Sequence, residues 1–298
     1  MRLKILINIA LILIFVVLAA GCGSNFDAEF DDYMTSMEEV HALDEEYDEK
    51  IAQLDIDDLP EEVSTRNSEV NLEKLISISE TLDQEIVPVV ERMNDKVVGI
   101  EVTESSLVDL HETYIESMEV KQNFVQNLND YVKTYSSSVR STEELIQLSQ
   151  DFMKNQSERD EVIESATKES ESNEIEGLIS QINDNSEELE EESQMLQLDE
   201  SQSNKMAHID DTMLPLIDSH IQSLNQMNLD TDRAMRVRSL TLEMYYGFKK
   251  YYQERKNTME YNNRLQELQL QNILPLRETY EELDREYDTQ IEEIESEL

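Results

Sequence analysis

The chain has 298 residues, of which 68 are acidic and 24 are basic, and its formal net charge at pH 7 is −44. A surface this acidic cannot offer the extended basic face that releases counterions from phosphate groups, so we expect no nucleic-acid partner. It should also repel anionic lipid headgroups and anionic wall polymers, so attachment to a membrane must come from something other than surface charge.

Residues 1–21 have the features of a signal peptide and are excluded from the fold. Arg2 and Lys4 form a positive start, an almost unbroken apolar run extends from Ile5 to Ala20, and small residues lead into Cys22, the only cysteine. The apolar run is marginal for a membrane span of about 20 residues. A lone cysteine forms no intrachain disulfide, so stability must come from packing.

The segment Ala19-Ala20-Gly21-Cys22 resembles the lipobox of bacterial lipoproteins, although Ala19 stands where leucine is usual. The resemblance implies cleavage between Gly21 and Cys22 and a covalent diacylglyceryl and N-acyl lipid at Cys22. We expect no other cofactor. The alternative is an ordinary secretory signal with an incidental cysteine.

The first helix is expected at 26–54. Its apolar side chains recur at alternating steps of four and three, as on one face of an amphipathic helix, and Asp44 is the one missed position. A second helix should begin after Asp58 and end near Gly99. We expect a kink at Pro88, because proline removes a backbone hydrogen bond.

A third helix is expected at 107–139, where Lys121 alone breaks the apolar stripe. Ser141-Thr142-Glu143-Glu144 has the spacing of a capping box, so a new helix should start there. The apolar pattern then fades into 164–173, the best candidate for a linker or a frayed segment. The acidic residues from 158 to 200 are expected to form a solvated helix face rather than a cation site.

A helix predicted at 206–224 should be kinked or started at Pro215, and a central helix is expected from Asp232 to Asn272. Within the central helix, the stretch from Arg233 to Lys256 holds seven basic residues and two acids. These cations should serve as counter-charges for neighbouring acidic helices. The central helix ends before Pro275, and a last helix runs to the C-terminus.

Two internal echoes are present. Residues 43–51 and 283–291 are identical at six of nine positions, and an apolar pair followed by proline and another apolar residue recurs at Pro88, Pro215 and Pro275. The echoes indicate either two related helical units or coincidence among helical sequences. No fixed period supports a solenoid.

The lack of any alternating apolar run of strand length predicts an all-α fold. We expect an elongated antiparallel helical bundle of about six to eight helices, with coiled-coil-like long helices. The expected divisions are a lipoprotein signal peptide (1–21), a lipidated tether (22–25), an N-terminal helical unit (26–140), an acidic helical or linker segment (141–204) and a C-terminal helical unit (205–298).

Residues with catalytic or metal-binding spacing are sparse. Glu38 and His41 form one Glu-x-x-His step, which supplies half of a di-metal site in some helical bundles, but no other histidine follows an acid at that spacing. There is no nucleophile elbow, phosphate-binding glycine loop or EF-hand. We therefore expect no metal site and no enzymatic activity.

The remaining motif is Glu243-Met244-Tyr245-Tyr246 in the central helix. Apolar side chains on two faces around it are typical of an interior helix, so we expect these four residues to be core rather than a ligand-binding box. Gly247 should permit close helix approach. With the lipobox, the motif resembles the EMYY-motif lipoproteins of Gram-positive bacteria, and the chain is more weakly similar to cell-wall-binding lipoproteins. Because this family has no established activity, the resemblance assigns no catalytic or binding residues to this chain.

Together these features predict a lipoprotein anchored to the cell membrane on the extracytoplasmic face of a Gram-positive bacterium. We expect a non-catalytic binding or scaffold protein at the interface between membrane and cell wall. Its partner should be a basic protein segment or an amphipathic helix laid in a groove of the bundle. The alternative is a metal- or solute-binding lipoprotein that serves a transporter.

Overall fold

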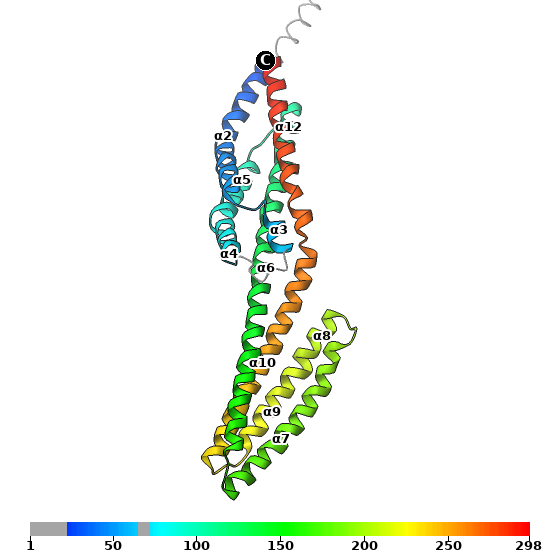
Figure 1. Cartoon of the computed structure of the whole chain (residues 1–298). Helices are drawn as coiled ribbons and strands as arrows, with labels where there is room; N and C mark the ends of the chain where they lie inside the picture. Colours follow the sequence, from blue (N-terminus) through cyan, green and yellow to red (C-terminus); the bar gives the residue numbers. More distant parts are fainter. Residues whose placement is uncertain (1–22, 65–71) are drawn as a thin grey trace, which may run out of the picture. The chain divides into compact units, whose positions relative to one another are not determined.

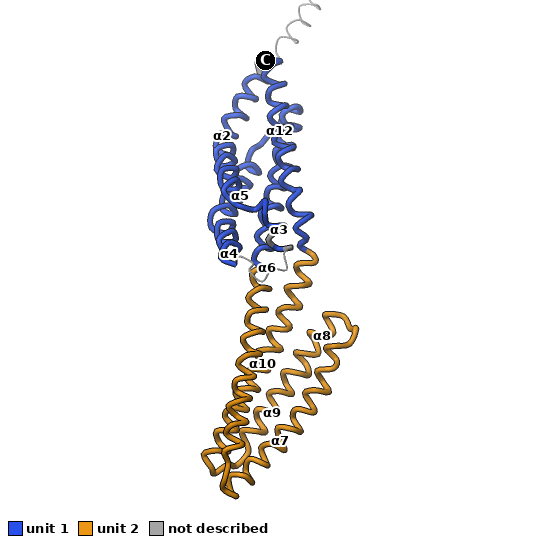
Figure 2. Tube along the Cα trace, viewed as in Figure 1, with its two compact units in different colours: residues 1–133, 268–298 blue, residues 134–267 orange. Residues whose placement is uncertain are grey.

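The structure, a computed structural model, describes residues 23–64 and 72–298, and the regular elements in these ranges are all helices. The expected all-α fold is confirmed. The signal peptide and Cys22 lie outside the described residues. Contacts divide the chain into two compact units (Figure 2): unit 1 comprises residues 1–133 and 268–298, and unit 2 comprises residues 134–267.

The helices of unit 1 come from both ends of the chain (Figure 1). They are α2 (Gly23–Gln53), α3 (Leu59–Ser64), α4 (Leu72–Thr81), α5 (Val87–Val97), the first part of α6 (Ser105–Glu164), α11 (Leu270–Ile273) and α12 (Pro275–Glu297). Helix α2 packs on α5, and α12 brings the C-terminal residues against side chains of α2 and α6. The start of α2 and the end of α12 lie at the same end of unit 1 (Figure 1).

The core of unit 1 follows from the apolar spacing of α2. Steps of four and three turn one face of this helix inward, and the side chains on that face are buried: Phe30, Tyr33, Met37, Val40, Tyr47 and Ile51. Helices α4, α5, α6 and α12 supply the facing side chains, including Leu75, Met93, Phe124, Leu128 and Tyr280. Each fully buried large apolar side chain contributes about 1.5–3 kcal/mol of transfer free energy.

Two prolines that were expected to kink or start helices each follow a π-helical turn. The turn η1 (Leu82–Ile86) precedes Pro88 in unit 1, and the turn η3 (Ile209–Met213) precedes Pro215 in unit 2. In both turns, the residue before the proline donates its N–H to the carbonyl five residues back rather than four. Because proline has no N–H to complete an α-helical ladder, the wider turn rearranges the bonds without ending the helix.

The helix expected between Asp58 and Gly99 is described in two parts. Helix α3 begins at Leu59, directly after Asp58, and α4, η1 and α5 together run from Leu72 to Val97. The expected start and end are therefore close to those observed, and residues 65–71 between the two parts lie outside the described residues.

Helix α6 is continuous, so the helix start expected at Ser141 is wrong. Ser141 Oγ donates to Glu254 Oε2 at 2.8 Å, and Thr142 Oγ1 donates to the Ser138 carbonyl at 2.9 Å. Hydroxyl groups that bond a neighbouring helix or the preceding turn do not cap backbone N–H groups. The capping-box spacing therefore occurs inside a helix.

Unit 2 contains the rest of α6, together with α7 (Glu169–Gln194), α8 (Gln202–His208), α9 (Leu214–Gln226) and α10 (Asp232–Glu267). Helix α10 packs on α9 and α7. The buried core of the unit is Ile175, Leu178, Leu189, Met213, Ile217, Ile221, Leu224, Ala234, Val237 and Tyr245. The linker expected at 164–173 is reduced to a short connection, because α6 ends at Glu164 and α7 begins at Glu169.

The boundaries expected at 140 and 204 are wrong. Residues 268–298 belong to unit 1, because Tyr280 and Tyr287 of α12 are buried against aromatic side chains of α2. The acidic segment 141–204 is not separate, since its helix α7 packs on α9 and α10. Residues 23–25 already belong to α2, so the tether expected at 22–25 is wrong for them.

Candidate functional site

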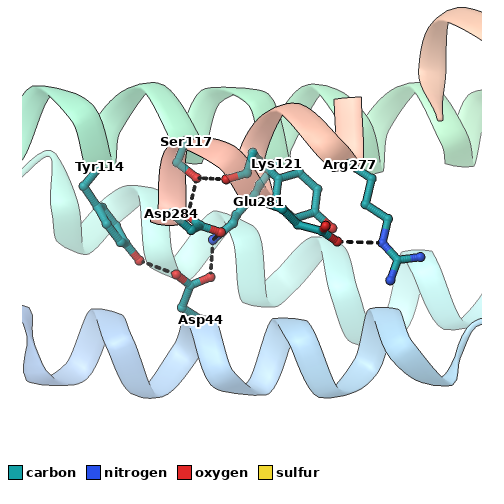
Figure 3. Close-up of polar contacts among 8 residues, drawn as sticks. Asp44, Tyr114, Ser117, Lys121, Arg277, Glu281 and Asp284 are labelled. Carbon is teal, nitrogen blue, oxygen red and sulfur yellow. Dashed lines mark hydrogen bonds and ion pairs between the residues drawn. The ribbon is translucent and has the colours of Figure 1, made fainter. Parts of the chain in front are cut away.

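A buried lysine, Lys121 of α6, lies in the core of unit 1, and its side chain is only 1% exposed. Its Nζ lies 2.6 Å from Asp44 Oδ1 of α2 and 2.9 Å from Asp284 Oδ2 of α12 (Figure 3). Asp44 and Lys121 are the two positions that interrupt the apolar stripes of their helices, and Asp284 is the counterpart of Asp44 in the nine-residue echo. The two interruptions and the echo therefore meet in one ion cluster.

Hydroxyl groups and aromatic rings surround the cluster. Tyr114 OH donates to Asp44 Oδ2 at 2.9 Å, and Ser117 Oγ donates to Asp284 Oδ1 at 2.5 Å (Figure 3). The ring centroids of Tyr47 and Tyr280 lie 5.7 and 5.5 Å from Lys121 Nζ, within the range of cation–π attraction. These contacts offset the cost of taking the three charges out of water.

The lysine stays charged in this environment. Burial alone would lower the pKa of Lys121, but the two neighbouring carboxylates outweigh it and the pKa is raised. Burial raises the pKa of Asp284, and the lysine counteracts that effect. Because its charged atoms bind one another, the cluster is suited to joining α2, α6 and α12 rather than to binding a ligand.

Two tyrosines and two histidines form a hydrogen-bonded row beside the cluster. Tyr33 OH lies 3.5 Å from His111 Nδ1 and 3.3 Å from Tyr287 OH, and Tyr287 OH lies 3.1 Å from His41 Nε2. Burial lowers the pKa of both histidines and raises the pKa of Tyr33 to about 12. The row is therefore neutral near pH 7. Tyr287 OH occupies His41 Nε2, and within the described residues Glu38 and His41 belong to no cluster that could hold a metal ion.

The other two histidines bind acidic residues of α7 in unit 2. His208 Nε2 lies 2.9 Å from the Glu192 carbonyl, and His220 Nε2 lies 2.9 Å from Glu188 Oε2. Among the described residues, no group of three or more His, Cys, Asp and Glu side chains is arranged to hold a metal ion.

The cations of α10 bind acids on the helices around it. The pairs are Arg233 with Glu171, Arg236 with Glu158, Lys249 with Asp218, and Lys256 with Asp210. The expected role as internal counter-charges is confirmed for these four residues. Acids of unit 2 therefore neutralise more than half of the seven basic residues in this stretch.

The Glu243-Met244-Tyr245-Tyr246 motif is divided between the core and the surface. Met244 and Tyr245 are buried, and the Tyr245 ring lies edge-on to His220 with a centroid distance of 5.8 Å. Glu243 is exposed and Tyr246 is 52% exposed. The expectation that all four residues are core is therefore wrong for Glu243 and Tyr246. On one helix, four successive residues turn through about 300°, so they cannot share a face.

An open apolar groove lies beside the motif in unit 2, between α6 and α10. It has a volume of about 350 Å³ and is lined by Leu148, Ser149, Phe152, Met153, Gly247, Phe248 and Tyr251. The rings of Phe152 and Phe248 form part of its wall, with centroids 4.7 Å apart. A Cβ added at Gly247 would meet nothing within 4 Å. The expected close helix approach at Gly247 is therefore wrong, and this glycine opens the groove instead.

The family is decided by a match over nearly the whole chain: the model of the EMYY-motif containing lipoproteins aligns with residues 3–295. The chain belongs to this family. Searches of curated proteins and of solved structures returned no match. Within residues 23–64 and 72–298, no helix combines the length and the apolar composition of a membrane span.

The groove thus begins at Gly247, the residue that directly follows the motif that names the EMYY lipoproteins, and none of the four motif residues lines it. Sequence reasoning identified Met244, Tyr245 and Gly247, but it assigned them all to packing. It missed Leu148 and Phe152 as groove residues, because their spacing reads as an ordinary amphipathic stripe, and it missed Met153, which lies outside that stripe. The exposure of these side chains would have marked them as groove residues. Exposure depends on which other helices cover them, and the sequence does not give this.

Proposed function

We propose that this EMYY lipoprotein is a non-catalytic binding or scaffold protein anchored by lipid at Cys22. Its place would be the extracytoplasmic face of the cell membrane of a Gram-positive bacterium, at the interface with the cell wall. The lipobox-like segment before Cys22 and the lipoprotein family support the anchor. The start of α2, which follows Cys22 directly, would place one end of unit 1 close to the bilayer.

The groove of unit 2 is the observation that supports a binding role. Its lining is apolar apart from the hydroxyl groups of Ser149 and Tyr251, and it contains no carboxylate, histidine or cysteine. Such a lining offers surface for an apolar partner, but it places no general base beside the Ser149 and Tyr251 hydroxyl groups and supplies no carboxylate, imidazole or thiolate for a metal ion. Non-catalytic binding is therefore the function that fits it best.

The anchor is tested by Cys22→Ala in the full-length chain. We expect the variant to remain unlipidated, and either to be released to the medium or to stay uncleaved. Fractionation of cells and mass spectrometry of the N-terminus measure both outcomes. A cleaved Cys22→Ala chain that stays in the membrane fraction, extractable only by detergent, would contradict the anchor.

The binding role is tested by crosslinking whole cells and identifying the attached molecules by mass spectrometry. We expect the same protein or proteins to be recovered in repeated experiments with the wild-type chain and to be lost with Cys22→Ala. Recovery of no protein partner would contradict the scaffold role. Saturable binding of a transition metal or a small solute by the purified chain would instead favour the transporter-linked alternative.

A further inference from the structure

One bank of the unit 2 groove, formed by α6, has exposed apolar side chains. Ile146 and Met153, seven residues apart on this helix, are each more than half exposed. Met153 lines the groove itself, and Ile146 lies two turns before it on the same face. Exposed apolar residues scattered singly need no explanation, but here they border an apolar cavity, as at sites that bind other proteins.

Gly247 keeps the groove open at a cost in helix stability. A glycine inside a helix is about 1 kcal/mol less favourable than alanine. No neighbour approaches the space that its side chain would fill, so packing does not require glycine at this position. The presence of glycine at position 247 is therefore better explained by the groove, which a larger side chain would partly fill.

The shape of the site fits a helix. A groove between two helices accepts the apolar ridge of a third, whose side chains at successive turns fill the gap. The seven-residue separation of Ile146 and Met153 on one bank corresponds to two turns, the repeat of such a ridge.

The net charge of unit 2 indicates which charge the exposed face of a helix bound in the groove should carry. Unit 2, residues 134–267, contains 28 acidic and 13 basic residues, so its net charge is strongly negative. Four cations of α10 are already bound to acids of neighbouring helices. A helix with a basic polar face would be attracted to the groove, whereas an acidic helix or a second copy of this acidic chain would be repelled.

We propose that the groove between α6 and α10 binds an amphipathic helix of another protein, apolar on the buried face and basic on the exposed face. The inference rests on the proposed binding function and names the class of partner. Ile146 and Met153 would contact the apolar ridge at the rim, and Phe152, Phe248 and Tyr251 would contact it inside the groove.

The test uses the lipidated chain in nanodiscs of zwitterionic lipid and two fluorescent helical peptides. Both peptides carry leucine at alternating steps of three and four; one has lysine on the polar face and the other has glutamate. Empty nanodiscs measure binding to lipid alone. We expect the lysine peptide to bind at least about tenfold more tightly than the glutamate peptide, with a difference that shrinks as salt rises.

Two variants locate the binding site. Gly247→Leu fills open space, and Met153→Gln removes an exposed apolar group from the opposite bank, so neither should lower the melting temperature. Each should weaken binding of the lysine peptide by about tenfold or more, which corresponds to a loss of about 1.4 kcal/mol of binding free energy. Gly177→Leu is the matched control: Gly177 is an exposed helical glycine of α7 whose added Cβ would meet only the end of Met227 at 4.0 Å.

Each other outcome overturns part of the proposal. Undiminished binding by Gly247→Leu would overturn the groove as the site, and equal or tighter binding of the glutamate peptide would overturn the basic face. Dimers of the wild-type chain that Gly247→Leu abolishes would make a second copy the occupant. The whole-cell crosslinking experiment separates a wrong binding site from a wrong function. If wild type and Gly247→Leu capture the same protein partner equally, the binding function stands and only the groove is refuted as its site.

Discussion

Replacement of Lys121 by methionine should destabilise unit 1 far more than the loss of an ordinary surface ion pair. The variant leaves two carboxylates facing each other without their cation. Their oxygens are no further apart than the sum of the two ion-pair distances, 2.6 and 2.9 Å. Removing one partner of a buried pair costs about 3–5 kcal/mol, and the residual exposure of Asp44 (17%) and Asp284 (28%) places the expected loss near the lower limit.

The same helix provides a matched control. Lys133 of α6 binds Asp83 at 2.6 Å, but both side chains are close to half exposed. Exposed pairs contribute only about 0–1 kcal/mol, so Lys133→Met should cost correspondingly little. The comparison holds residue type, helix and bond length nearly constant and varies burial.

The pH dependence of the Lys121→Met variant follows from the sign of the carboxylate shift. Burial raises the pKa of Asp284, and loss of the lysine removes an opposing effect. A carboxyl whose folded-state pKa is raised stabilises the fold only when protonated, and this stabilisation is lost as pH rises through that pKa. The loss in free energy of unfolding of Lys121→Met relative to wild type should therefore be largest near pH 7 and shrink toward pH 4.

The assay is urea unfolding followed by far-UV circular dichroism, with hydrogen exchange to assign the transition to unit 1. Adding Asp44→Asn and Asp284→Asn to Lys121→Met should recover much of the loss, because the amide oxygens can still accept from Tyr114 and Ser117. Equal losses for Lys121→Met and Lys133→Met, or a deficit independent of pH, would refute the reasoning.

Three further predictions concern single positions. Met244→Ala should lower the free energy of unfolding by about 2–5 kcal/mol and exposed Tyr246→Ala by less than about 0.5, measured by urea unfolding. Gly247→Ala should raise the melting temperature, since alanine is the better helix former by about 1 kcal/mol; a lower value would contradict the open space there. Because burial lowers the pKa of His41 and His111, the stability they contribute is present above about pH 6.5 and lost on acidification. His41→Gln and His111→Gln should each flatten the fall of urea midpoint below that pH, and an unchanged slope would contradict this.

The sequence was sufficient to locate most helices, because a repeating apolar step reports directly which face of a helix is buried. It could not say which other helix covers that face. Asp44 and Lys121 were each visible as a break in a stripe, and residues 283–291 as an echo of 43–51. Only the return of α12 to unit 1 shows that the three belong to one cluster.

The same limit applies to the groove. The spacing of Leu148 and Phe152 predicts an inward face, yet both residues line an open groove. Periodicity also favoured burial of the whole Glu243–Tyr246 motif, although helical geometry itself would have separated its members. Local pattern is therefore informative about propensity, whereas exposure depends on the tertiary arrangement.

The π-helical turns before Pro88 and Pro215 make two places in the chain tolerant of a one-residue deletion. A bond that spans five residues encloses one residue more than an α-helical bond. Deleting one residue within such a turn could restore α-helical spacing and leave the flanking faces in their present orientation. A deletion in the middle of α10 would instead rotate all later side chains by about 100°. Each turn thus contains one residue more than an α-helix needs at that point, and the helical segments on its two sides keep their own packing contacts.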